Sequence, residues 1–378
     1  MIGRAFLAAM LAARLILAQE DPNAVLARAR VKVAGITGRL LKYTCLETIE
    51  RMYYAMPVEK TSHKLMTVAP SCENKQLGKN GRLWITAKDR LRLEVAVAGG
   101  DGIHEINSWA AASRFDSRSI FEMVVTGPIS SGAFGTSLID VFENPGVRFS
   151  LIDGKGEGPR RIFEYAFEVP AQASHYAIKV GNEWKDAPYH GLIQINAATA
   201  DLMMLIEETD KIPPGGETCA ARTSIAYHLV PIGDGQFLVP RQVELETLSP
   251  DASETASVTN YSACHEYAAE STVRFDDGDA ASATKTAPAA PIALPPDVSL
   301  TLALLHPIDT DTAAAGDEVS AKVVKEVRTK DSKTILVPAG AVAHGRILQM
   351  RHQYASTQFQ ISIRFDTLEI NEIGRAHV

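Results

Sequence analysis

The clearest pattern in the chain is an alternation of apolar and polar residues that recurs in many short segments. In the segment 91–97, leucine or valine occupies every second position, with arginine, glutamate or alanine between. Because side chains of a strand point alternately to its two faces, this spacing predicts a strand with one buried face. Similar strands are expected at 163–169, 176–180, 192–195, 202–206, 225–230, 237–248 and 271–275. Turn sequences separate several of them, so we expect an antiparallel sheet with its strands in sequence order.

A helix is expected before this sheet. Apolar residues recur at steps of three and four along one side of a helix that Asp21 and Pro22 can start. This stripe consists of Leu26, Ala29, Val33, Ile36 and Leu40. Such a stripe has to pack against another element, and the sheet that follows is its natural partner. A shorter helix is expected at 135–144, where the Pro-Gly pair at 145–146 ends it.

A linker divides the chain. Between residues 276 and 296 the composition changes to alanine, proline, threonine and serine, with almost no large apolar side chain. A segment of this kind cannot bury enough apolar surface to become ordered. Strand-like alternation then resumes. We therefore expect a first β domain at 19–275 and a small second β domain at 297–371.

The two ends of the chain differ from the rest. Arg4 is followed by a run rich in alanine and leucine from 5 to 18, and then by polar residues, which is the order of a secretory signal. We expect residues 1–18 to be a signal peptide and the protein to be periplasmic or secreted; a buried N-terminal helix is the alternative. Residues 372–378 match the translation of a common sequencing adapter. We expect the natural C-terminus to be missing and the second domain to be truncated.

Four cysteines are present, and none lies in a C-x-x-C pair, which argues against a zinc site and a thioredoxin-like site. In an oxidising compartment this even number predicts two disulfides, with free thiols as the alternative. Three pairings are open. We favour Cys45 with Cys72 and Cys219 with Cys264, because each joins neighbours along the chain.

No set of residues meets the requirements of a catalytic centre. The glycine-rich segment 127–135 lacks the spacing of a phosphate-binding loop, and the histidines show no metal-ligand spacing. We therefore expect no enzymatic activity, no cofactor and no metal site. The formal charge is −7, and no cluster of lysine or arginine with interleaved aromatic residues is present, which argues against nucleic-acid binding. No segment after residue 18 approaches the ~20 apolar residues of a membrane-spanning helix.

Two regions resemble known families. The leading helix, the meandering sheet and the hairpin 191–206 resemble the lipoprotein-carrier superfamily of LolA, LolB and RseB. This resemblance implies a half-barrel that holds an acyl chain or a lipoprotein between sheet and helix. Segments 43–45, 48–51, 89–95 and 237–240 are similar to a family of uncharacterised exported bacterial proteins, which implies no function. Segments 316–321 and 337–345 resemble the β-barrel of TrbI-type conjugation proteins.

The fold class expected from these patterns is mainly β (α+β): an antiparallel half-barrel-like sheet with an N-terminal helix, followed by a small second β domain. The expected function is that of a non-enzymatic soluble cell-envelope protein that binds a lipid, a lipoprotein or another apolar partner. Val33, Ile36 and Leu40 are the residues expected to line an apolar ligand pocket. The alternative is a structural or assembly component of an envelope or secretion complex, with other envelope proteins as its partners.

Overall fold

The structure is a computed structural model that describes residues 20–38, 42–56, 71–79, 82–99, 103–110, 115, 119–180, 183–209, 212, 216–266, 292–295, 298–329, 334–370 and 374–377. The expected signal peptide, the strand expected at 271–275, most of the expected linker and Leu40 lie outside these residues, so the predictions made for them stay predictions. Within the described part of the chain, no helix is both long and apolar enough to cross a membrane.

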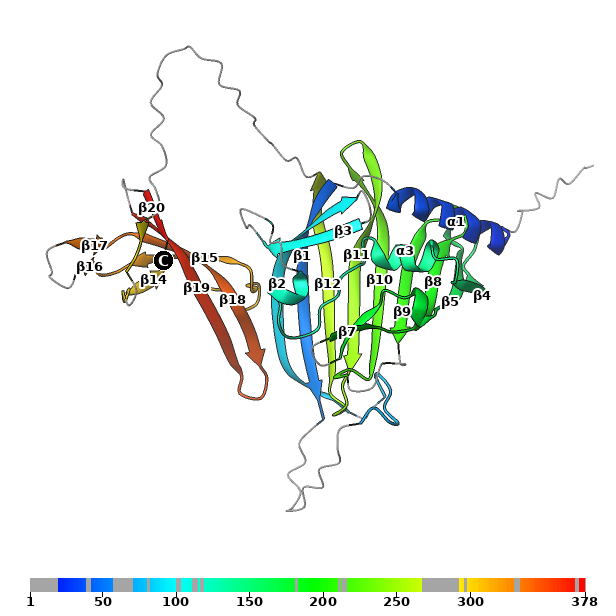
Figure 1. Cartoon of the computed structure of the whole chain (residues 1–378), viewed down its shortest axis with the longest axis horizontal. Coiled ribbons are helices and arrows are strands. Elements are labelled where there is room, and N and C mark those ends of the chain that lie inside the picture. Colours follow the sequence, from blue (N-terminus) through cyan, green and yellow to red (C-terminus); the bar gives the residue numbers. More distant parts are fainter. Residues whose placement is uncertain are drawn as a thin grey trace, which may run out of the picture.

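Most of the described chain forms one sheet of 16 strands that stays open (Figure 1). Its first part contains β1 (Lys42–Ala55), β2 (Trp84–Gly99), β3 (Ile103–Trp109), β4 (Arg148–Lys155), β5 (Ile162–Val169), β8 (Tyr189–Asn196), β9 (Leu202–Thr209), β10 (Ala220–Ile232), β11 (Gly235–Leu248) and β12 (Glu254–Glu266). The order across the sheet is β4-β5-β8-β9-β10-β11-β12-β1-β2, with β3 beside β2. The mainly β, antiparallel fold expected from the sequence is therefore confirmed. β6 (Ala177–Val180) and β7 (Glu183–Asp186) form a separate hairpin.

Three helices accompany this sheet: α1 (Pro22–Thr37), α2 (Ile120–Met123) and α3 (Thr136–Phe142). α1 begins at Asp21, whose side chain accepts a hydrogen bond from the Asn23 N–H at 3.1 Å. It buries Val25, Ala29, Val33 and Thr37. The expected stripe was partly wrong, because the residues that face the core follow a strict spacing of four, and Leu26 and Ile36 pack only at its margins. α3 is slightly shorter than the helix expected at 135–144.

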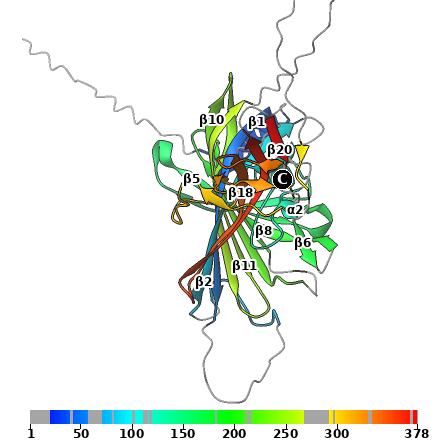
Figure 2. The same ribbon diagram turned by 90° about the vertical axis from the view of Figure 1, so that its left-hand side faces the viewer.

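The second unit contains β13 (Ile292–Ala293), β14 (Leu302–Leu304), β15 (Glu318–Val323), β18 (Val342–Gln353), β19 (Gln358–Ile370) and β20 (Gly374–His377), with β16 (Val327–Arg328) and β17 (Ile335–Val337) as a separate pair. Figure 2 views the molecule from the side of this unit. β18 pairs with β2, placing Arg351 opposite Asp89, and Ala315 forms a bridge to Leu91. One sheet therefore runs through both expected domains, while their independent folding stays a prediction.

All four cysteines form disulfides, but the favoured pairing was wrong. Cys45 is joined to Cys264, and Cys72 is joined to Cys219. The sheet order explains the first bond, because β1 pairs with β12 and Cys45 lies at an irregularity of that ladder. The residues around Cys72 lie beside the turn between β11 and β12, where the Ser71 N–H donates to the Pro250 carbonyl at 3.1 Å. Contacts between strands, rather than proximity along the chain, therefore decide the pairing.

Candidate functional site

One face of the large sheet is covered by α1, α2 and α3, and we call it the covered face (Figure 1). One row of residues across this face is largely apolar, and its members are Tyr165, Ile193, Leu205, Ile225, Val243, Thr259, Ile49 and Leu91. The next row in the same register carries polar side chains, and these are Glu207, Thr223, Ser257, Arg51 and Asp89. All five of these polar residues are buried. Apart from Leu245, this second row is therefore polar on five strands, and we call the rest of the covered face, which contains the main hydrophobic cluster, the apolar half.

A segment at 119–142, which we call the cover segment, lies over this face. It contains α2, α3 and the chain that connects them. Its side chains Phe134, Leu138, Val141 and Phe142 belong to the main hydrophobic cluster together with α1. The ring of Phe134 lies 5.0 Å from that of Tyr261, edge to face. The apolar half of the covered face is thus filled by the chain's own side chains.

A buried ion pair holds one end of the connecting chain. Arg51 donates to both carboxylate oxygens of Asp89, from Nε at 2.6 Å and from Nη2 at 3.0 Å. Its Nη1 donates to the carbonyl oxygen of Thr126 at 2.5 Å. Gly127 follows with a φ of +88°, and a Cβ there would overlap the Tyr53 hydroxyl. The cover segment therefore approaches the sheet closely at this point, where only glycine fits.

A carboxylate holds the other end. Glu105 on β3 accepts hydrogen bonds from the backbone N–H groups of Gly132 at 2.8 Å and of Phe134 at 2.9 Å. The hydroxyl of the buried Tyr227 donates to the carbonyl oxygen of Ala133 at 2.7 Å. Three successive residues of the cover segment are therefore fixed by side chains of the sheet. Burial raises the pKa of Glu105, and the two backbone hydrogen bonds oppose that rise.

A second carboxyl group lies beside Glu105. Glu47 on β1 is only 2% exposed. Its Oε2 accepts a hydrogen bond from the Asn107 amide at 3.0 Å, and the Tyr261 hydroxyl lies 3.3 Å from its Oε1. Burial, and then the charge of Glu105, raise the pKa of Glu47 to about 8. This carboxyl group therefore retains its proton at neutral pH.

The polar row contains a third group of this kind. Burial and the nearby charge of Asp140 raise the pKa of Glu207 to about 7, against a hydrogen bond from the Ser137 side chain that lowers it. Further along the row, the hydroxyl of Ser257 is buried and has no hydrogen-bond partner among the described residues. Unsatisfied polar atoms of this kind are uncommon in protein interiors.

The β6–β7 hairpin also contacts the cover segment. At its base, His175 contacts the carboxylate of Asp140 on α3 twice, through its backbone N–H at 2.9 Å and through its ring Nδ1 at 2.5 Å. Asp140 accordingly raises the pKa of His175. Further along the hairpin, the ring of Trp184 lies 4.9 Å from that of Phe121 on α2. The hairpin therefore touches both helices of the cover segment.

The opposite face of the sheet is charged. One row of it carries ionisable side chains on six neighbouring strands, in the order Arg148, Glu168, His190, Glu208, Arg222 and Glu246. The Arg222 Nε lies 3.2 Å from a Glu208 oxygen. Opposite charges on facing strands stabilise a sheet that is exposed to water.

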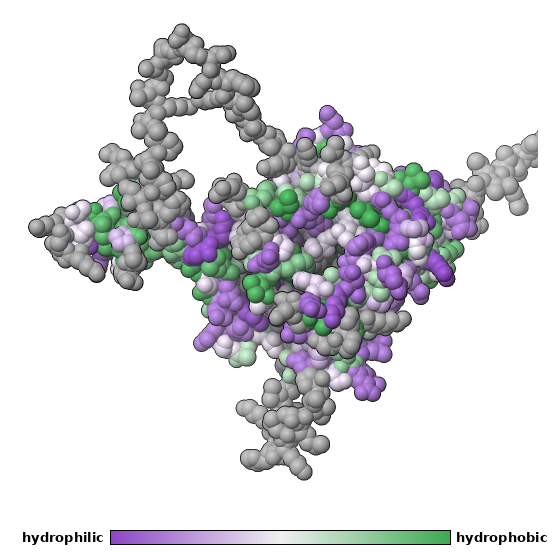
Figure 3. All heavy atoms as spheres, viewed as in Figure 1, coloured by the Kyte–Doolittle hydropathy of each residue, from purple (hydrophilic) through white to green (hydrophobic). Residues whose placement is uncertain are grey.

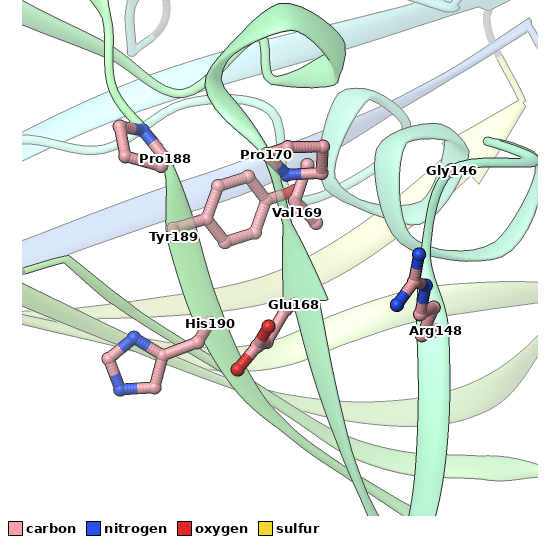
Figure 4. A pocket seen from close by; sticks show the side chains of 8 residues that line it. All are labelled: Gly146, Arg148, Glu168, Val169, Pro170, Pro188, Tyr189 and His190. Carbon is pink, nitrogen blue, oxygen red and sulfur yellow. The ribbon is translucent and has the colours of Figure 1, made fainter.

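Two of the hollows at the surface of the described residues are the best formed. The first, of about 320 Å³, is lined by Gly146, Arg148, Glu168, Val169, Pro170, Pro188, Tyr189 and His190. Figure 4 shows Glu168 and His190 pointing to the same side of neighbouring strands. The second, of about 340 Å³, lies where Arg92 of β2 meets residues 306–320 of the second unit. Neither hollow is lined by the residues of the expected ligand pocket.

Of the residues expected to line that pocket, Val33 is 2% exposed and Ile36 packs beside it in the same cluster. The pocket itself stays a prediction. The sequence reasoning missed Glu47, Arg51 and Glu105. A signal was present, because Glu47 and Arg51 share the alternation of Cys45 and Ile49, which places charged side chains on a buried face.

Comparisons with known proteins do not show a family. No family model matches the chain, and no curated protein matches it. Among solved structures, it is similar to an outer membrane lipoprotein-sorting protein domain from Vibrio parahaemolyticus, with a TM-score of 0.28 and 10% identity over 67% of this chain and 94% of that one. The TM-score is too low for this likeness to bear on function. The expected resemblance to TrbI-type proteins gains no support.

Proposed function

We propose that this protein is a non-enzymatic component of the cell envelope that binds a lipid, a lipoprotein or another apolar partner on its covered face. The observation that carries this proposal is the kind of structure that shields the covered face from water. A large open sheet is covered by helices, by a connecting chain and by the small β6–β7 hairpin. Phe134 and Leu138 occupy the place that an acyl chain would take.

The exchange of these side chains for an acyl chain is energetically reasonable. A buried phenylalanine or leucine contributes about 1.5–3 kcal/mol, and each buried CH₂ group of a ligand contributes about 0.8 kcal/mol. A long acyl chain can therefore offset the contacts that the cover segment loses. The polar attachments of that segment lie at Thr126, at 132–134, at Ser137 and at Asp140, and these are the hydrogen bonds that the ligand contacts have to offset.

The cysteines support an extracytoplasmic location. All four are paired in the structure, and stable disulfides form mainly in oxidising compartments. Lipids and lipoproteins that cross an aqueous envelope compartment need a protein that shields their apolar parts.

Binding of a fluorescent long-chain fatty acid tests the proposal. Phe134→Ala removes a side chain that fills the apolar half, so we expect it to bind the probe several-fold more tightly than the wild type. Leu368→Ala is the matched control, because Leu368 is equally buried but belongs to the core of the second unit. Absence of binding by both the wild type and Phe134→Ala would contradict the proposal.

A structural or assembly role is the second candidate, and the second unit favours it. Several of its apolar side chains are 44–50% exposed, namely Leu304, Leu305, Val324 and Ile335. Figure 3 shows hydrophobic surface on this unit. A photo-crosslinking amino acid at Leu305 should give discrete protein adducts in the envelope if this role is correct. Adducts at Leu305, together with no lipid binding by Phe134→Ala, would favour assembly over lipid binding.

A further inference from the structure

Two carboxyl groups lie together beneath the cover segment without a positive charge. Glu47 on β1 is bonded to Asn107, which lies two residues from Glu105 on the same face of β3. Among the residues that the structure describes, no lysine, arginine or histidine forms an ion pair with either group. Arg51, which lies on the same face of β1 as Glu47, is already paired with Asp89. Placing two negative charges here would be costly, so the pair needs a proton.

The hydrogen bonds indicate which group carries that proton. Both oxygens of Glu105 accept from backbone N–H groups, at 2.8 and 2.9 Å, and a proton on either oxygen would weaken one of these bonds. Oε1 of Glu47 faces only the Tyr261 hydroxyl, which can accept as well as donate. The proton therefore belongs on Glu47, and the charge belongs on Glu105.

We propose that Glu47 and Glu105 form a proton-operated latch for the cover segment. In the closed form, ionised Glu105 holds the backbone at 132–134, and Glu47 stays protonated because it is buried beside that charge. When the segment lifts, water reaches both groups and Glu47 releases its proton. Opening is therefore favoured as pH rises, and closure is favoured as pH falls.

The other titratable groups at this place do not compensate. The groups that face the pair are Tyr43 of β1, Tyr227 of β10 and Tyr261 of β12. Burial raises the pKa of all three above its usual value of 10, so they stay neutral over the range in which Glu47 titrates. The cover residues that lie on Glu105 are Gly132, Ala133 and Phe134, which carry no charge. The pKa of Glu47, about 8 against an ordinary 4.5, places the transition near neutral pH.

Hydrogen exchange of the amides at 132–134 in the full chain tests the latch. After correction for intrinsic exchange, we expect the open population of the wild type to rise between pH 6 and pH 8, by up to about tenfold per pH unit because one proton is released. Glu47→Gln keeps the polar contacts but removes the Glu47 proton, so its open population should rise less steeply with pH than that of the wild type; the raised pKa of Glu105 leaves a smaller dependence. Glu50→Gln is the control, because Glu50 lies on the opposite face of β1 and pairs with Lys88 and Arg90. This control should retain the wild-type dependence.

Two results would overturn the latch: equal opening of the wild type at both pH values, or a rise of opening with pH that is as steep in Glu47→Gln as in the wild type. The wild-type measurement decides the question even where the variant folds poorly. One part of the latch proposal depends on the proposed function, namely what the open form does. Because the exchange experiment contains no lipid, failure of the latch and failure of lipid binding are separate outcomes.

Discussion

Arg51 and Asp89 form a two-armed ion pair inside the protein, in which the two side chains are 6% and 5% exposed. The pair joins β1 to β2, and the remaining donor of Arg51 reaches the carbonyl oxygen of Thr126. One guanidinium group therefore fixes both the sheet and the segment that covers it.

Asp89→Asn should be strongly destabilising. The substitution leaves the charge of Arg51 buried without its partner, and a loss of this kind typically lowers the free energy of unfolding by about 3–5 kcal/mol. Chemical denaturation at pH 7 measures the change. Asp366→Asn is the control, since the Arg364–Asp366 pair is more than half exposed on average and should contribute at most about 1 kcal/mol. Similar effects of the two substitutions would show that Arg51 is not enclosed.

Glu207 should make stability depend on pH. Its pKa is about 7 in the folded protein and near 4.5 when unfolded, so the folded state retains a proton that the unfolded state releases. The resulting stabilisation is complete below pH 4.5 and is lost as pH rises through 7. Glu207→Gln should therefore be more stable than the wild type at pH 8, and should lose part of the decline between pH 5 and pH 8.

Denaturation of both proteins at these pH values measures the effect. Glu244→Gln, on an exposed position of β11, should behave as the wild type. If Glu207→Gln leaves the decline unchanged, the carboxyl group is ionised throughout this range.

Peptide mapping without reduction should recover a Cys45–Cys264 peptide and a Cys72–Cys219 peptide. Replacing both cysteines of one pair by serine should lower the free energy of unfolding by about 2–4 kcal/mol, because the unfolded chain gains freedom. Recovery of a Cys45–Cys72 peptide would contradict the strand order, since β1 would then have a different neighbour.

Gly316 should be required for the contact between the two units. It has a φ of +107°, and a Cβ there would overlap the Arg92 carbonyl oxygen and come within 3.0 Å of the Trp109 ring. After proteolysis within 276–296, we expect the wild-type fragments to elute together from a sizing column and those of Gly316→Val to separate. Gly340→Val is the control, because Gly340 has a similar φ of +93° and a Cβ there would meet only the Lys322 side chain of its own unit, at 3.7 Å. Separation of the wild-type fragments would show that pairing of β18 with β2 is too weak to hold the units together.

Many of the strands and the first helix could be predicted from the sequence because each depends on local periodicity, whereas β3, β4 and β12 were missed. Leu91, Leu93, Val95 and Val97 alternate in the chain and are all buried in the structure. The order of the strands in the sheet does not depend on local periodicity. Pairing of β1 with β12 joins residues about 200 positions apart, and nothing local in either strand specifies the other. The disulfide pairing failed for this reason.

The candidate site could not be predicted for a related reason. Arg51 and Asp89 become partners only when β1 and β2 pair. Glu105 and the N–H groups of Gly132 and Phe134 become partners only when the cover segment meets β3. In the sequence these residues look like the polar positions of any half-exposed strand. The sequence signal was that Glu47 and Arg51 occupy the same alternate positions as the apolar residues Cys45 and Ile49.

The bond between Cys45 and Cys264 closes the backbone from residue 45 to residue 264 into a covalent ring. A single proteolytic cut in any loop of this ring leaves two pieces of chain that remain joined by the disulfide. The nicked product keeps both pieces at high effective concentration, so the sheet can stay assembled after damage that would divide an unlinked chain. In a compartment rich in proteases, the protein would then come apart only after a second cut or after reduction of the disulfide, and not after the first cut.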